Sequence, residues 1–266
     1  MWDPQQYAKF AAERSRPFTD LLARVDLAPA RVVDLGCGSG TLTHTLCERW
    51  PTAVVTGVDS SEAMIRDAAG RSLPDRLRFV LGDLTTWAPE EPVDLVVANA
   101  VLQWLPDHLD LLGRLASFVA PGGVIAFHVP GNLQAPSHTI VRDLRVSSRW
   151  RDRVGEGADR NLEVAQPSEY LDALLACDLH PDVWESTYLQ LLTGEDPVLE
   201  WLKGAALRPV LDRLDERERE AFCAELGPLL RSAYPSGERG TVLPYRRIFA
   251  VASRGRAGLT GEGAAP

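Results

Sequence analysis

The sequence has little of what marks proteins that bind nucleic acid or cross a membrane. Its 28 Lys and Arg are outnumbered by 37 Asp and Glu, which gives a formal net charge of −9, and Lys and Arg form no continuous run, although five arginines lie between Arg142 and Arg153. A nucleic-acid-binding protein usually presents a basic face to the phosphates, so we expect a small-molecule ligand instead. No apolar run approaches the roughly 20 residues that span a bilayer, and residues 1–4 lack the pattern of a signal peptide. We therefore expect a cytoplasmic protein without nucleic-acid or membrane partners.

Cysteine is also scarce. The four cysteines are far apart and include no CxxC pair; they are Cys37, Cys47, Cys177 and Cys223. Their spacing fits no zinc site and no disulfide framework, so we expect reduced thiols and no bound metal.

What the sequence does have is an alternation of short apolar runs with helical patterns. Such alternation predicts βαβ units, and hence a mostly parallel sheet with helices on both faces. The expected strands are residues 32–35, 53–58, 77–81, 93–98 and 124–129, with helices near 41–49, 62–69 and 109–118. Pro17 is expected to separate two N-terminal helices, and Pro121-Gly122-Gly123 to form a turn before the fifth strand.

The remainder of the chain predicts a different arrangement. Residues 183–192 and 248–252 read as two more strands, and Pro197–Tyr234 between them as almost wholly helical. We expect a division into N-terminal helices or lid (1–30), ligand-binding core (31–130), connecting helices and strand six (131–195), helical cap (196–235), last strand (236–254) and disordered tail (255–266). No internal repeat is present.

The first expected strand runs directly into a glycine-rich loop. Asp34-Leu35-Gly36-Cys37-Gly38-Ser39-Gly40 precedes a helix, whose free N–H groups favour an anionic ligand group. The third glycine comes one residue too early for the dinucleotide pattern G-x-G-x-x-G, and no GK[ST] of a P-loop follows. A tight turn without a ligand is the alternative reading of this loop.

Three more polar positions follow expected strands at their carboxyl ends, the edge where open parallel sheets bind ligands. Asp59 follows the second strand and could accept hydrogen bonds from both hydroxyls of a ribose. Asp83 follows the third and could accept one from an adenine amino group, and Asn99 closes the fourth. Asp59 and Asp83 could instead cap helices.

These motifs identify a family resemblance. The stretches VVDLGCGSG, GVDSSEAMI, GDLTTW and VVANAVLQWLPDH resemble those of class I S-adenosylmethionine-dependent methyltransferases. The chain is further similar to the trans-aconitate 2-methyltransferases in AAERSRP (11–17), NAVLQWLPDH (99–108), VPGN (129–132), DVWESTY (182–188), LRP (207–209) and PYRRIF (244–249). The likeness extends from residue 1 to about residue 252. It departs from the family pattern at Ser39, where proline is usual, and at His128, where glutamine is usual.

The resemblance implies a fold, a cofactor and a reaction. The fold is a Rossmann-like, seven-stranded, mostly parallel methyltransferase sheet, with a helical lid from the N-terminus and from the insert before the last strand. The reaction is esterification of trans-aconitate with release of S-adenosylhomocysteine, by a monomer or homodimer. The implied cofactor-binding residues are Asp34, Gly36, Cys37, Gly38, Gly40, Asp59, Ser60, Met64, Gly82, Asp83, Leu84, Asn99, Ala100 and Trp104.

Trans-aconitate carries three carboxylates that are ionised at neutral pH, so its attacking oxygen needs no general base. We therefore expect no catalytic acid or base, only positioning. Arginine forks would hold the other two carboxylates, and the candidates in family motifs are Arg14, Arg16, Arg208, Arg246 and Arg247. The full expected substrate set is Arg14, Arg16, Gln103, Trp104, His128, Asn132, Tyr188, Arg208, Tyr245 and Arg246. Each arginine taken alone could be a surface charge.

Two other functions remain open from the sequence. A methyltransferase could act on another small carboxylate or on a natural-product hydroxyl, although the arginines suit a polyanion better. The second open function is that of a non-catalytic protein that binds S-adenosylmethionine.

Overall fold

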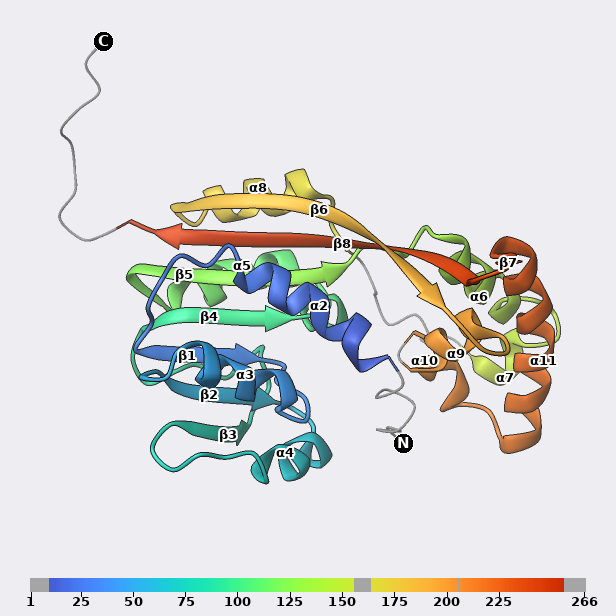
Figure 1. The fold of residues 1–266 in the computed structure, drawn as a ribbon, viewed down its shortest axis with the longest axis horizontal. Coiled ribbons are helices and arrows are strands. Elements are labelled where there is room, and N and C mark those ends of the chain that lie inside the picture. The colour runs from blue at the N-terminus through green and yellow to red at the C-terminus, as the bar shows by residue number, and fades with distance from the viewer. Residues whose placement is uncertain (1–9, 156–163, 205, 256–266) are drawn as a thin grey trace, which may run out of the picture. The chain divides into compact units, whose positions relative to one another are not determined.

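The chain forms a single sheet with helices around it (Figure 1). A computed structural model describes residues 10–155, 164–204 and 206–255. Residues 1–9 of the expected N-terminal segment and residues 256–266 of the expected disordered tail lie outside this range. The strands are β1 (Arg31–Leu35), β2 (Val54–Asp59), β3 (Leu77–Leu81), β4 (Val93–Asn99), β5 (Val119–Pro130), β6 (Leu179–Leu192), β7 (Ser236–Gly237) and β8 (Gly240–Arg254).

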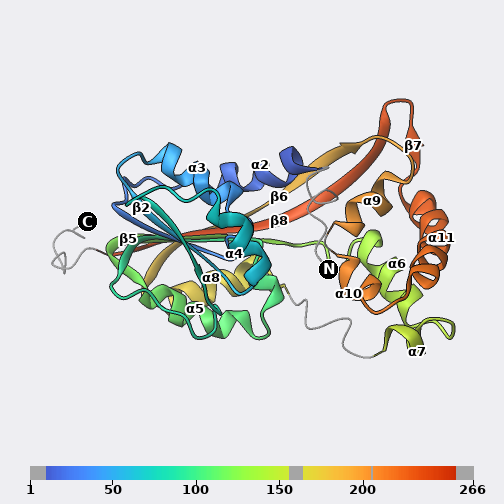
Figure 2. The ribbon, with the colours of Figure 1, turned by 90° about the horizontal axis from the view of Figure 1, so that it is seen from below.

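The strand order is β3-β2-β1-β4-β5-β8-β6, with the two-residue β7 paired to β8 alone. The five strands from β3 to β5 are parallel. In the central β1 and β4 almost every residue is buried, as expected for strands covered on both faces. Figure 2 shows α2 (Ala11–Leu22) and α3 (Thr41–Arg49) on one side of the sheet, and α5 (His108–Ser117) and α8 (Pro167–Leu175) on the other. The predicted mostly parallel sheet with helices on both faces is confirmed, although it has eight strands instead of seven because the short β7 pairs with β8.

The remaining helices are α4 (Glu62–Ala69), η1 (Leu102–Trp104), α6 (Pro136–Arg145), α7 (Arg151–Val154), α9 (Pro197–Lys203), α10 (Arg208–Leu211) and α11 (Glu216–Ala233). The last three confirm the predicted helical insert between β6 and β8. None of the helices that the structure describes is long and apolar enough to cross a membrane.

Two local predictions are wrong, and both concern proline. Pro17 lies inside one continuous helix, α2. The reason is that Pro17, Phe18, Leu21 and Leu22 lie on the same face of this helix and are all buried. Pro121-Gly122-Gly123 lies inside β5, where Gly122 has φ +81° and the β4 register shifts between Val93 and Leu95. The residues predicted as a turn therefore form a bulge within a longer strand.

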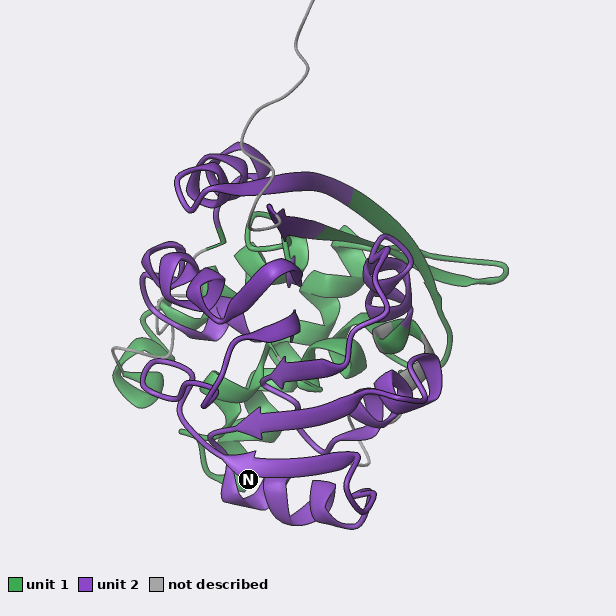
Figure 3. Ribbon diagram, turned by 90° about the vertical axis from the view of Figure 1, so that its left-hand side faces the viewer, with its two compact units in different colours: residues 1–15, 130–164, 186–247 green, residues 16–129, 165–185, 248–266 purple. Residues whose placement is uncertain are grey.

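Two compact units divide the chain, and each is formed by several segments (Figure 3). Unit 1 comprises Met1–Ser15, Pro130–Val164 and Ser186–Arg247, and unit 2 comprises Arg16–Val129, Ala165–Glu185 and Ile248–Pro266. Unit 2 contains β1 to β4 with the predicted glycine loop. Unit 1 contains α6, α7 and α9 to α11, packed in a core that includes Trp150, Trp201, Phe222, Leu243 and Tyr245.

Candidate functional site

The glycine loop leaves β1 and enters α3 with three glycines in left-handed conformation. Gly36, Gly38 and Gly40 have φ of +72°, +55° and +77°. A Cβ on Gly36 would lie 2.4 Å from Cγ2 of Val101, and one on Gly40 would lie 2.5 Å from Cζ of Phe79. Nothing lies within 4 Å of the corresponding position on Gly38. The loop is therefore tightly packed at both ends and open at its middle, where a ligand can approach the backbone.

Asp59 ties this loop to the next helix. At the end of β2, its Oδ2 accepts a hydrogen bond from the backbone N of Gly38 at 2.9 Å, and its Oδ1 accepts one from N of Ser61 at 2.9 Å. Ser61 in turn caps α4 by accepting from N of Met64 at 3.4 Å. A carboxylate can accept about four hydrogen bonds. Asp59 can therefore order both loops and still receive ribose hydroxyls.

Asp83 also combines a local role with spare acceptor capacity. Its Oδ1 accepts from the backbone N and from Oγ1 of Thr85, at 2.8 and 2.6 Å. These two bonds favour the ionised form and lower the pKa of Asp83. The side chain is exposed, and its Oδ2 remains available, whereas the neighbouring Leu84 is buried.

Asp34 differs from these two because it is 2% exposed. Its Oδ2 accepts a hydrogen bond from Oγ1 of Thr43 at 2.6 Å, whereas its Oδ1 is buried without a donor. Burial raises the pKa of Asp34 to about 7; the Thr43 bond opposes this rise and the charge of Asp59 adds to it. A buried carboxylate with one empty acceptor favours a cationic or N–H-bearing ligand group. Thr43 was not predicted from the sequence, although its position in the first turn of α3 faces it towards β1.

Two more acceptors without donors lie at the end of β4, which pairs with β1. They are Oδ1 of Asn99 and Oε1 of Gln103, both buried. Gln103 is oriented by donation from its Nε2 to the carbonyl of Ala100 at 2.6 Å. Ala100 has φ +53° and donates its N–H to the carbonyl of His128. The carboxyl ends of β1 and β4 thus carry three buried oxygens that lack a donor among the described residues.

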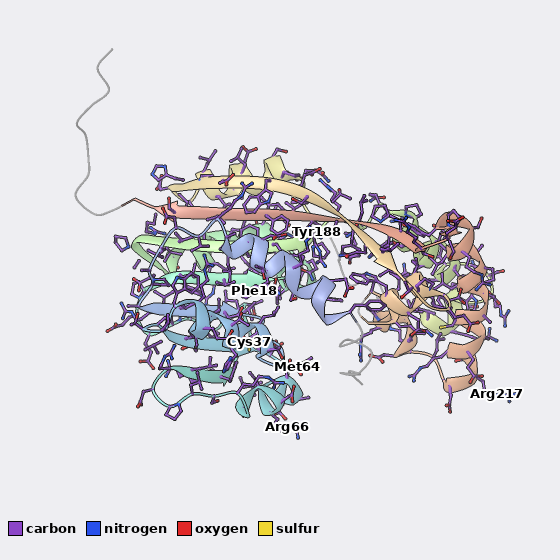
Figure 4. All side chains as sticks on the ribbon, viewed as in Figure 1. Phe18, Cys37, Met64, Arg66, Tyr188 and Arg217 are labelled. Carbon is purple, nitrogen blue, oxygen red and sulfur yellow. The ribbon has the colours of Figure 1, made fainter. Side chains whose placement is uncertain are left out.

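Cys37 cannot serve as a nucleophile in this loop. Burial and the nearby charges of Asp34 and Asp59 raise the pKa of its thiol far above the ordinary value. The thiol donates weakly to the carbonyl of Gly38, at 3.7 Å. Figure 4 labels Cys37, together with Met64 of α4, among the side chains of this unit. The four cysteines are free thiols, and no group of three or more metal-ligating side chains occurs in the described part of the chain.

His128 is held in an aromatic column within unit 2. Its ring packs edge-on against Phe249 at 5.4 Å, and Phe249 stacks on Trp184 at 4.9 Å with an angle of 5° between planes. The guanidinium of Arg24 covers the other face of Trp184 at 3.8 Å. This packing accounts for the burial of His128. Arg24 was not predicted from the sequence, because no motif contains it.

Two other expected substrate residues of unit 2, Trp104 and Arg16, are more open. Trp104 is 45% exposed at the end of η1. The side chain of Arg16 is 63% exposed, with Nε 3.9 Å from Oδ2 of Asp20. Arg14 lies in the part of α2 that belongs to unit 1, and its side chain is outside the described residues.

Unit 1 contains Asn132, Tyr188, Arg208, Tyr245 and Arg246 of the expected set. The structure brings Asn132 and Arg246 together, because the Asn132 amide bonds to the Arg246 backbone at 2.8 Å in both directions. Arg208 is mostly buried, with a guanidinium nitrogen 3.7 Å from Oδ2 of Asp212. Tyr188 and Tyr245 are both buried. Gln190 was not predicted from the sequence; its buried Nε2 lacks an acceptor among the described residues.

Comparison with known proteins identifies the family to which this chain belongs. Residues 7–172 match a family model described as a methyltransferase domain. The trans-aconitate 2-methyltransferase of Streptomyces avermitilis is 51% identical over 95% of this chain and 97% of its own length. Those of Rhodococcus jostii and Mycobacterium tuberculosis are 49% and 45% identical, over 95% and 98% of this chain and 99% and 100% of their own lengths.

Solved structures agree on the fold. The plantazolicin methyltransferase BpumL in complex with SAH matches with a TM-score of 0.53, at 16% identity over 96% of this chain and 91% of its own. The cyclase SpnF matches with a TM-score of 0.57, at 15% identity over 91% of this chain and 82% of its own. A cyclase on this fold shows that the fold alone does not give the reaction. The sequence relatives are more specific than the fold, and they place this chain in the trans-aconitate 2-methyltransferase family.

Proposed function

We propose that the protein transfers the methyl group of S-adenosylmethionine to one carboxylate of trans-aconitate, and releases the monomethyl ester and S-adenosylhomocysteine. The observation that carries the proposal is the 45–51% identity to trans-aconitate 2-methyltransferases over at least 95% of this chain. Membership of a methyltransferase family confirms S-adenosylmethionine as the predicted methyl donor.

The residues of unit 2 fit this donor. Its methionine end carries an ammonium and a sulfonium, and Asp34, Asn99 and Gln103 offer three buried oxygens without donors. We assign the ribose hydroxyls to Asp59 and the adenine amino group to Asp83. The open backbone at Gly38 allows close approach of the ligand. The donor would also lie against the other cofactor-binding residues predicted from the sequence, which are Gly36, Cys37, Gly40, Ser60, Met64, Gly82, Leu84, Ala100 and Trp104.

The chemistry asks the chain for orientation and charge rather than for a proton acceptor. When bound, S-adenosylmethionine supplies a methyl group on a sulfonium sulfur, which keeps the bonding electron pair as the methyl leaves. The attacking carboxylate is ionised near neutral pH, because carboxyl pKa values lie around 4. The residues therefore have to hold one carboxylate oxygen in line with the methyl group, a contribution of positioning.

The two carboxylates that do not react need cationic partners. Arginine provides a planar pair of N–H donors that matches a carboxylate. We assign this role to the predicted arginines Arg14, Arg16, Arg208 and Arg246, with Gln103, Trp104, His128, Asn132, Tyr188 and Tyr245 completing the substrate-binding set.

Steady-state assays with single acceptors test the proposal. Purified protein is incubated with S-adenosylmethionine and with trans-aconitate, cis-aconitate, citrate or a simple phenol, and methylated products are detected by mass spectrometry. We expect a monomethyl ester from trans-aconitate with the highest kcat/KM. If another acid or a phenol is methylated and trans-aconitate is not, the proposed substrate is wrong, whereas the assignment of S-adenosylmethionine as methyl donor stands. No turnover despite binding of S-adenosylmethionine would favour a non-catalytic protein.

A further inference from the structure

Two threonines of α3 use their hydroxyl groups in different ways. Oγ1 of Thr45 donates to the carbonyl of Leu42 at 2.6 Å, a local bond that threonine commonly forms within a helix. Oγ1 of Thr43 instead donates outside its helix, to Oδ2 of Asp34 in β1, also at 2.6 Å. Thr43 is fully buried and Asp34 is 2% exposed. A hydrogen bond that is shielded from solvent therefore joins the first turn of α3 to the end of β1.

This hydrogen bond decides which oxygen of Asp34 a ligand can use. A hydroxyl has one hydrogen to donate, and Thr43 places that hydrogen on Oδ2. Oδ1 is buried and accepts no hydrogen bond from the described residues. Because a threonine side chain is stiff at χ1, the bond also holds the carboxylate in one orientation. Oδ1 is thus left as the acceptor for a cationic or N–H-bearing group.

A proton and a ligand compete for this same oxygen. Burial raises the pKa of Asp34 to about 7; the bond from Thr43 opposes the rise because it stabilises the charged form, and the charge of Asp59 adds to it. Since Oδ2 already accepts the hydrogen of Thr43, a proton that Asp34 binds near neutral pH is placed on Oδ1. An ammonium group that donates to Oδ1 requires this oxygen to be unprotonated. Binding of such a group at or below pH 7 therefore sends the proton to the solvent.

The ionisable side chains on the elements next to Asp34 leave the stabilisation of its charge to Thr43. Asp59 at the end of β2 carries the same charge as Asp34. Cys37 in the loop keeps its proton, because burial and the charges of Asp34 and Asp59 raise the pKa of its thiol. The others interact elsewhere: Asp94 of β4 with the backbone N of Ala30 and Arg31, and in α3 His44 with Glu48, Cys47 with the carbonyl of Arg76, and Arg49 with the carbonyl of Leu22.

We propose that Thr43 is a positioning residue for the methyl donor. It holds Oδ2 of Asp34, so that the ionised Oδ1 receives the ammonium group of S-adenosylmethionine, and a proton on Oδ1 leaves to the solvent as the donor binds. Thr43 lies outside the sequence stretches that carry the family resemblance. This inference rests on the proposed function, which assigns Asp34 to the methionine end of the donor, and deepens it by naming the residue that prepares the carboxylate.

The first test compares Thr43→Val with the wild type across pH, with the Kd for S-adenosylmethionine measured by calorimetry. Valine has a similar shape but no hydroxyl, so this Kd should rise about tenfold or more at pH 6. Loss of the hydrogen bond raises the pKa of Asp34. The ratio of the variant Kd to the wild-type Kd should therefore fall between about pH 6 and pH 8.5, as Asp34 ionises in both proteins.

Two further variants control this comparison. Thr43→Ser keeps the hydroxyl and should bind the donor nearly as tightly as the wild type. Thr45→Val removes the hydroxyl that bonds within α3, and it should leave the Kd unchanged at every pH. If Thr43→Val does not fold, Thr43→Ala takes its place. A Kd ratio that does not change with pH, no recovery in Thr43→Ser, or an equal effect of Thr45→Val would overturn the inference.

The second test asks whether Thr43 acts through Asp34. Calorimetry at pH 6 in buffers with different ionisation enthalpies counts the protons released when S-adenosylmethionine binds. The wild type should release about one proton per donor molecule, and Asp34→Asn should release almost none. In protein that already carries Asp34→Asn, Thr43→Val should change the Kd little. Equal proton release by Asp34→Asn and the wild type, or the same effect of Thr43→Val in both backgrounds, would overturn the inference.

These measurements separate the inference from the proposed function, because they follow donor binding and need no trans-aconitate. Wild-type protein that releases the expected proton on binding S-adenosylmethionine, but does not methylate trans-aconitate, would overturn the proposed substrate and support the inference. Wild-type protein that methylates trans-aconitate, but releases no proton when the donor binds at pH 6, would overturn the inference alone.

Discussion

At the scale of single residues, Asp34 and Asp59 illustrate how similar positions acquire different tasks. Both lie at the carboxyl ends of adjacent strands, β1 and β2. Asp59 accepts two backbone N–H groups and organises the loops around the ligand. Asp34 is buried, and its Oδ1 accepts no hydrogen bond from the described residues. Its burial therefore lowers the stability of the protein until a ligand supplies a donor.

Asp34 should make the ligand-free protein less stable as the pH rises. Its ordinary pKa of 3.8 is raised to about 7 by burial. Between these values the unfolded chain has lost the proton that the folded protein still holds, so stability falls with rising pH and the full penalty is present above pH 7. This rise in pKa corresponds to a loss of about 4 kcal/mol of folding stability at most.

Asp34→Asn removes this titration. The Tm of this variant minus that of the wild type should rise from about pH 4 to about pH 7 and then level off. The same variant should bind S-adenosylmethionine more weakly. Identical pH dependence of Tm in both proteins would contradict the account of Asp34.

Asp59→Ala tests the ribose assignment. The change removes a carboxylate that orders Gly38 and Ser61 and would receive two hydroxyls. Hydrogen bonds to charged groups contribute about 1.5–3 kcal/mol, so the Kd for S-adenosylmethionine should rise about 10- to 100-fold, measured by calorimetry. The matched control is Asp67→Ala, an exposed acidic residue of α4, which should leave this Kd unchanged. A small effect of Asp59→Ala would place the ribose elsewhere.

At the scale of elements, the strand-to-helix loop is constrained by packing as much as by its ligand. Gly40→Ala would force a left-handed φ on alanine, which costs about 1–2 kcal/mol of stability. The added Cβ would also lie only 2.5 Å from Cζ of Phe79. We expect a lower Tm and loss of S-adenosylmethionine binding. Gly70→Ala is the comparison, because Gly70 has φ −65° and its nearest atom would be 3.8 Å away. It should change Tm little; equal effects of the two changes would contradict the packing argument.

Which elements could be predicted depends on whether local pattern or distant packing decides them. The buried strands were predictable because each is a continuous apolar run between helical patterns, and the glycines and acidic residues follow them directly. The continuous helix through Pro17 was not, because burial of one side of α2 outweighs the local preference of proline. Nor could the sequence separate Arg246 from Arg247, since an alternating strand has two faces and only packing shows which is buried.

At the scale of the whole molecule, the net charge of −9 does not favour a trianionic substrate. Substrate recognition must therefore depend on local cations. The arginines of the family motifs are the candidates, and one of them, Arg247, is 7% exposed. The buried side-chain oxygens of Asp34, Asn99 and Gln103 that lack a donor among the described residues lie in unit 2, which also contains the predicted residues for binding the methyl donor.

Catalysis without a base predicts a flat pH profile. With both substrates saturating, kcat should vary little between about pH 6.5 and pH 8.5, because the carboxyl groups of trans-aconitate are ionised throughout. Initial rates across this range test the prediction. A limb with a slope of one near neutral pH would indicate a general base, and would point to a hydroxyl acceptor instead of a carboxylate.

The central claim is the transfer of a methyl group to a carboxylate of trans-aconitate. The most direct measurement is a competition in one reaction, with S-adenosylmethionine carrying a ¹³C methyl group and equal concentrations of trans-aconitate, cis-aconitate and citrate, followed by NMR. The account predicts that the label appears first and mainly as a methyl ester of trans-aconitate. Label in another acid, or in no ester at all, would contradict it.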